Sequence, residues 1–127
     1  MSVRIEHLGC AGHFICAESC RYRQNTEILG EKKSYRVSTV GDLWLNLKDG
    51  KKRTEIGYGG KDWKAYYETM VFKIDAEKPA KGSEGCGCHE VLDWCELDCA
   101  RYETVAEARA GHQRMVEEYA RRAEEAA

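Results

Sequence analysis

Apolar and polar residues alternate through much of the first three quarters of the chain, which is the pattern of β-strands with one buried face. The clearest example is YYETMVFKI, in which Met70, Phe72 and Ile74 fall on one side. The YRVSTV run adds the β-branched and aromatic residues that favour strands. The pattern predicts strands over residues 3–8, 35–40, 43–47 and 66–74, and an exposed strand or extended arm over residues 21–29.

Glycine, aspartate and proline mark the predicted connections. Asp49-Gly50 is a strong signal for a tight hairpin turn. The three glycines between residues 57 and 60 predict a flexible loop, and residues 75–85, which hold the only proline, predict a linker or mobile loop. The VLDWCELDCARY segment that follows fits either a helix or a strand.

A long helix is predicted at the C-terminal end. Thr104 and Glu107 have the Thr-x-x-Glu spacing of a capping box, and the run to Ala127 is rich in strong helix formers. Gly111 marks a point where this helix can approach the sheet closely. The predicted fold class is α+β, a mostly antiparallel sheet packed against one long C-terminal helix. The predicted inner face of the helix consists of Val105, Ala108, His112, Met115, Tyr119 and Ala123.

The length of 127 residues predicts a single domain with a modest core. Residues 1–75 are expected to be mainly β, residues 76–103 to be a loop and a cysteine-rich connection, and residues 104–127 to be helix. No apolar run approaches the roughly 20 residues of a membrane span, and the first ten residues lack the pattern of a signal peptide. We therefore expect a cytoplasmic protein with no membrane partner.

Charge is distributed unevenly along the chain. Residues 21–53 contain nine basic and four acidic residues, whereas residues 84–127 contain eleven acidic and five basic residues. The basic middle suits phosphate or an acidic protein surface, and the acidic tail would repel nucleic acid. The alternative is that both are solvated faces that partly neutralise each other. The candidate partner-binding residues are Arg21, Arg23, Lys51, Lys52 and Arg53.

Seven cysteines and four histidines are the candidate chemistry of the chain. Two histidines and three cysteines fall within residues 7–20, and a CGCH run occupies residues 86–89. Two pairs of thiolates from short turns are a ligand set that zinc accepts in tetrahedral geometry. The predicted structural zinc ligands are Cys16, Cys20, Cys86 and Cys88, with His13 or His89 as possible substitutes.

Two other interpretations of these cysteines stay open. Free cysteine is among the most buried residue types, so the side chains can be interior thiols without a metal. A disulfide, for example between Cys16 and Cys86, would require an oxidising compartment. The odd number of cysteines means that complete disulfide pairing would leave one over.

A cysteine near a histidine is also the minimum requirement for thiol catalysis. Cys10, His13 and His112 are the candidate catalytic residues of this alternative, with His7 in the same cluster. They would form a thiol- or metal-dependent hydrolase site. The competing interpretation is that His7, His13 and His112 are interior histidines held by hydrogen bonds.

The motifs HLGCAGHFICAESCRYRQNT, YRVSTVGD and YETMVF, with the late CGC and the helical AGH, resemble a family of small proteins common in phage and prophage genomes. The similarity extends from about His7 to His112. The family has no agreed activity, so the resemblance assigns no functional residue. It implies a protein made inside an infected or lysogenic bacterium, where small phage proteins often occlude host proteins that include CRISPR-type defence machinery.

These observations lead to three functional hypotheses. The first is a non-enzymatic phage accessory protein that binds a host protein or nucleoprotein complex, for example as an anti-CRISPR-like inhibitor of host defence. The second is the thiol- or metal-dependent enzyme. The third is a nucleic-acid-binding module, whose affinity would fall steeply with salt.

Overall fold

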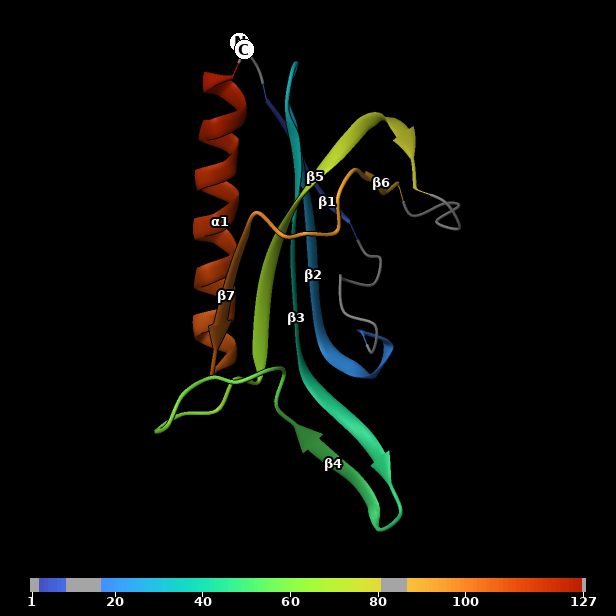
Figure 1. Ribbon diagram of the computed structural model, residues 1–127, viewed down its shortest axis with the longest axis vertical. Helices are drawn as coiled ribbons and strands as arrows, with labels where there is room; N and C mark the ends of the chain where they lie inside the picture. Colours follow the sequence, from blue (N-terminus) through green and yellow to red (C-terminus); the bar gives the residue numbers. More distant parts are fainter. Residues whose placement is uncertain (1–2, 9–16, 81–86, 127) are drawn as a thin grey trace.

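The computed structural model describes residues 3–8, 17–80 and 87–126. They form a seven-stranded antiparallel sheet and one long C-terminal helix that packs against it, which confirms the predicted α+β fold (Figure 1). The strands are β1 (Arg4–Leu8), β2 (Cys20–Leu29), β3 (Ser34–Leu47), β4 (Gly50–Thr54), β5 (Tyr67–Pro79), β6 (His89–Val91) and β7 (Asp98–Tyr102). A short 3-10 turn, η1 (Ala17–Ser19), precedes β2, and the helix is α1 (Val105–Glu125).

The strands follow the order β1-β2-β3-β5-β6 across the sheet. The second half of β3 also pairs with β4, and β7 lies beside the first half of β5. Every described strand pair is antiparallel, and short turns join β2 to β3 and β3 to β4. Figure 1 shows α1 along one face of the sheet and the β3–β4 hairpin extending past the end of the helix.

The main core lies between the sheet and α1. Ile28, Val37 and Val71, from three neighbouring strands, are fully buried against Val116 and Tyr119 of the helix. Complete burial of an aliphatic side chain contributes about 1.5–3 kcal/mol to folding. Apolar residues at alternate positions of the strands and along one stripe of the helix therefore hold the two layers together.

The helix begins where the capping box predicts. Thr104 accepts a hydrogen bond from the backbone N–H of Glu107, whose side chain accepts one from the backbone of Thr104. Its inner face differs from the prediction at two positions: Val105 is exposed and Met115 is only partly buried, whereas Val116 is buried. Val105 is exposed because it lies in the first turn of α1. No helix in the described ranges is long and apolar enough to cross a membrane.

Three predictions about the strands need correction. Residues 21–29 form a strand, which is one of the two predicted forms, but this strand is not exposed throughout: β2 lies between β1 and β3, and residues 25–29 are buried. Residues 75–79 extend β5 and are not a linker. The ambiguous segment before the helix contains β7, so residues 76–103 contribute strands as well as connections. Each error arose because strand neighbours are set by long-range pairing.

Candidate functional site

The predicted zinc ligands are only partly described by the structure. Cys16 and Cys86 lie outside the described residues, as does the substitute ligand His13. Cys20 and Cys88 are both described, and both are buried. Two of the four predicted ligands can therefore be placed.

Cys20 belongs to β2, and Cys88 contacts that strand at a different point. Cys20 begins the strand and packs with Leu43 and Ile56. Cys88 Sγ lies 3.6 Å from Asn25 Nδ2, five residues further along β2, which is roughly 16 Å of extended chain. Cys88 takes part in a disulfide, and a disulfide lacks the thiolate that binds metals. Within residues 3–8, 17–80 and 87–126, no group of three His, Cys, Asp or Glu side chains is arranged to hold a metal ion, and zinc binding stays a prediction.

A buried ionic cluster holds the second cysteine-histidine run on the outer face of the sheet, which is the face away from α1. Glu27, 1% exposed, accepts hydrogen bonds from Arg36 Nε and Nη2 at 3.3 and 3.2 Å. It also accepts the backbone N–H of His89 at 3.0 Å and lies 2.6 Å from His89 Nδ1. Arg36 Nη2 donates in turn to the carbonyl of His89 at 2.6 Å. The three residues form the outer cluster.

The outer cluster fixes both the main chain and the ring of His89. Because Nδ1 binds a buried carboxylate, Nε2 is the ring nitrogen left for a ligand, an arrangement common where histidine binds metal. The same contacts place the neighbouring Gly87 and Cys88 beside β1 and β2. A Cβ atom on Gly87 would lie 3.5 Å from Leu8 Cδ2, in the last residue of β1. The cluster therefore anchors the second run on the outer face of the sheet.

A row of hydroxyl and imidazole groups crosses the other face of the sheet, under α1. His112 of the helix is fully buried, with Nε2 2.8 Å from Thr26 Oγ1 and Nδ1 2.6 Å from Thr39 Oγ1. Thr26 Oγ1 also lies 2.9 Å from His7 Nδ1, and Thr39 Oγ1 lies 2.6 Å from Thr69 Oγ1. These five residues, one each from β1, β2, β3, β5 and α1, form the inner row.

The inner row keeps His112 neutral. Desolvation by burial, together with the neighbouring His7, lowers the pKa of His112 from its usual 6.5 to about 4. Both ring nitrogens are occupied by threonine hydroxyls, so His112 has no nitrogen facing solvent. This is the geometry of a hydrogen-bonded interior histidine, the competing interpretation of the sequence.

The alternative catalytic cluster is described only in part. Cys10 and His13 lie outside the described residues. The structure does bring His7 and His112 together, with Thr26 bridging their rings. His7 lies on the edge strand and is exposed, whereas His112 is enclosed. A cysteine-histidine pair stays a prediction.

The candidate partner-binding arginines are organised by aromatic rings at the base of the β3–β4 hairpin. Arg21 Cζ lies 4.2 Å from the centre of the Trp44 ring, and Arg53 Cζ lies 3.8 Å from that of Tyr66. Asp42 Oδ1 accepts hydrogen bonds from Trp44 Nε1 and Arg53 Nε, both at 2.8 Å. Asp42 has a positive φ of 55°, a conformation that aspartate tolerates better than most residues. These contacts order the base of the hairpin.

The lysines of the hairpin are arranged differently. Lys48, Lys51 and Lys52 are exposed at its tip and form no ion pair within the described part of the chain. Arg23 is exposed on β2. We call the three lysines, together with Arg21, Arg23 and Arg53, the basic end. Figure 1 shows that the hairpin projects from the body of the protein, so its tip is accessible.

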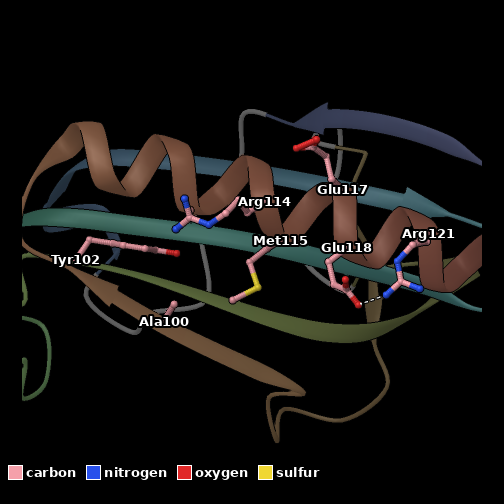
Figure 2. A pocket seen from close by; sticks show the side chains of 8 residues that line it. Ala100, Tyr102, Arg114, Met115, Glu117, Glu118 and Arg121 are labelled. Carbon is pink, nitrogen blue, oxygen red and sulfur yellow. Dashed lines mark hydrogen bonds and ion pairs between the residues drawn. The ribbon is translucent and has the colours of Figure 1, made fainter.

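A groove of about 650 Å³ runs between β7 and α1 (Figure 2). Ala100 and Tyr102 line its β7 side, and Met115 points into it from the helix. Glu118 accepts hydrogen bonds from Arg121 at 2.6 Å and from Arg122 at 2.7 Å, and these two bonds lower the pKa of Glu118 to about 2. The helix thus neutralises much of its own acidic charge, and the groove selects no single sign of ligand.

Sequence reasoning missed the outer cluster, although a signal for it was present. Glu27 and Arg36 are direct cross-strand partners, equally far from the turn that joins β2 and β3. Opposite charges placed symmetrically about a predicted turn indicate such a pair. The threonines of the inner row carried a weaker signal, because threonine is common in strands for its shape alone.

Comparison of the chain with protein-family models, with curated proteins and with solved structures finds no match.

Proposed function

We propose that this protein is a non-catalytic binding protein that docks on an acidic surface of another protein through its basic end. The observation that carries the proposal is the β3–β4 hairpin, which projects from the sheet with exposed lysines on an ordered base. The resemblance to phage proteins suggests a bacterial host protein or nucleoprotein complex as the partner, with CRISPR-type defence effectors among the candidates.

The geometry of the hairpin supports binding because the arginines at its base are held in place and the lysines at its tip are exposed. Arg21 and Arg53 are held over aromatic rings, so they lose little conformational freedom when a partner binds. The tip lysines are exposed and form no ion pair among the described residues, so they can meet a partner's charge. Complementary charge of this kind mainly sets the association rate and the choice of partner.

An acidic protein surface fits the whole chain better than a nucleic acid does. The formal net charge is −2, and residues 84–127 are strongly acidic. A polyanion as long as a nucleic acid would meet that repulsion, whereas a compact acidic patch on a protein meets the hairpin alone.

The test is a charge reversal at the tip, Lys48→Glu with Lys51→Glu and Lys52→Glu, in a quantitative pull-down from a nuclease-treated bacterial host lysate. The matched control reverses three exposed lysines at the opposite end of the sheet, Lys32, Lys33 and Lys78. Both variants change the net charge equally. We expect the control to keep the partner and the tip variant to lose it.

Two outcomes would contradict the proposal. If the tip variant retains every partner that the wild type captures, the basic end is not the contact. If capture disappears after nuclease treatment and the purified protein binds a single-stranded oligonucleotide with a steep dependence on salt, the protein is a nucleic-acid-binding module.

A further inference from the structure

We infer that the 92–97 loop, which connects β6 to β7, is a second docking surface for a basic segment of a partner protein that carries apolar side chains. Three of its six residues are large exposed apolar side chains: Leu92, Trp94 and Leu97 are 61%, 62% and 43% exposed. Single exposed apolar residues are common, but three together in one short loop indicate an interaction site. This surface is separate from the basic end.

The loop is ordered although its apolar side chains are exposed. The backbone N–H groups of Leu92 and Leu97 donate to the carbonyls of Lys73 and Val71 in β5, at 3.0 and 2.8 Å. The Asp93 carboxylate accepts the N–H of Cys95 at 2.9 Å, which closes a turn inside the loop. A loop held in this way pays little entropy when a partner binds.

Trp94 is the anchor of the surface. Its ring packs edge to face on Phe72 of β5, with ring centres 5.2 Å apart, so the exposed indole has a defined position. A cavity of about 230 Å³ opens beside it, with Arg36, His89, Glu90 and Val91 among its lining residues; the charge of Arg36 is paired with Glu27. Rigid tryptophans beside a pocket are typical centres of binding energy in protein interfaces.

The acidic charge of the loop favours a partner segment that carries lysine or arginine. Glu90, Asp93, Glu96 and Asp98 fall within nine residues that contain no lysine or arginine. Asp93 and Glu96 are exposed and form no ion pair in the described ranges. Lysine or arginine side chains of the partner would pair with these carboxylates. One of these basic side chains can lie on the Trp94 ring beside Glu90. An acidic partner would be repelled.

The test uses a fluorescent synthetic amphipathic peptide of leucine and lysine, titrated with the full chain and followed by anisotropy. We expect Trp94→Ala, and separately Asp93→Lys with Glu96→Lys, to raise the Kd by about ten-fold or more. Leu92→Ser is a second apolar variant, because Leu92 is exposed and its side chain is not part of the core. The matched controls, Tyr58→Ala and Glu55→Lys with Asp62→Lys, change exposed residues elsewhere and should leave the Kd unchanged.

Three results would overturn the inference. The first is a Kd within about two-fold of wild type for the loop variants. The second is equal binding of a matched peptide with glutamate in place of lysine. The third is light scattering that shows wild-type dimers which Trp94→Ala dissociates, because the loop would then bind a second copy of this chain. The tip variant of the hairpin should bind the peptide normally, so failure here is distinguishable from failure of the proposed function.

Discussion

The two faces of the sheet bury polar groups in opposite ways. The inner row under α1 is neutral, because His112 joins threonine hydroxyls and its pKa lies near 4. The outer cluster is ionic, because Glu27 and Arg36 are both buried with a carboxylate and a guanidinium in direct contact. Both solutions satisfy their hydrogen bonds, which is the condition for burying polar groups at acceptable cost. The difference is how much each face loses when one member is removed.

The contrast follows from what covers each face. The sheet and α1 enclose His112 and the three threonines of the inner row completely, and an imidazolium at His112 would have no carboxylate among its hydrogen-bond partners, so the neutral ring is favoured. On the outer face, Glu27 receives Arg36 together with two N–H groups of His89, and four contacts compensate the desolvated charge. Threonine suits the inner row because it combines a strand-forming shape with a hydroxyl.

Removal of the outer carboxylate is expected to have the largest effect. Glu27→Gln should lower the free energy of unfolding by about 3–5 kcal/mol, because Arg36 is left buried without its counterion. Urea denaturation measures this change. Glu6→Gln, at the exposed pair with Arg4, is the control and should cost no more than about 1 kcal/mol.

A double substitution separates charge from packing in the outer cluster. Glu27→Met with Arg36→Met removes both ions, and it should recover much of the stability lost in Glu27→Gln. If Glu27→Gln costs no more than Glu6→Gln, the supposed contrast between the two faces is wrong.

The burial of neutral His112 in the inner row should make the free energy of unfolding depend on pH. The unfolded chain protonates His112 as the pH falls below about 6.5, whereas the folded protein does so only near pH 4. Stability should therefore fall between pH 6.5 and 4, by about 3 kcal/mol in total from this residue, and this loss should be complete below pH 4.

The measurement compares wild type with His112→Gln by urea denaturation at several pH values. The variant should show a shallower decline between pH 6.5 and 5, above the range where most carboxylates titrate. His7, the neighbouring titratable group, remains in both proteins. Identical slopes would show that His112 is not held neutral by the fold.

A substitution at the close contact between α1 and β7 should have the smallest of the three effects on the free energy of unfolding. A methyl group at Gly111 would collide with the Tyr102 ring and hydroxyl. Gly111→Ala should therefore lower the free energy of unfolding by about 1–3 kcal/mol, although the same change in an open helix stabilises it by about 1 kcal/mol. Thermal melts measure the sign. In a Tyr102→Leu background the substitution should cost less, and a stabilising effect in the wild-type background would contradict the close approach.

Much of the architecture could be predicted because it is encoded locally. Alternation in residues 66–74 identified β5, Asp49-Gly50 identified the β3–β4 turn, and the Thr104 capping box identified the start of α1. These signals depend on the strand and helix periods and on turn chemistry alone. The fold class followed from them.

The candidate site was harder to predict because it depends on contacts between distant segments. His112 was recognised as an inward-facing histidine, but its threonine partners lie 86 and 73 residues away along the chain. The burial of residues 25–29 depends on α1, which covers Thr26 and Ile28, and on the Cys88–His89 segment, which covers Asn25 and Glu27. The exposed apolar loop before β7 went unnoticed, since its exposure follows from the fold and not from its composition.

The pairing of Glu27 with Arg36 also bears on how the chain chooses between alternative structures. Side chains in a strand alternate between the two faces of the sheet. A slip of β2 by a single residue would therefore turn the Glu27 carboxylate toward the apolar core under α1 and away from the Arg36 guanidinium. A hairpin of β2 and β3 in the wrong register would therefore bury an unpaired carboxylate in the apolar core. The ion pair between Glu27 and Arg36 therefore favours the observed register of β2 and β3 over registers shifted by one residue.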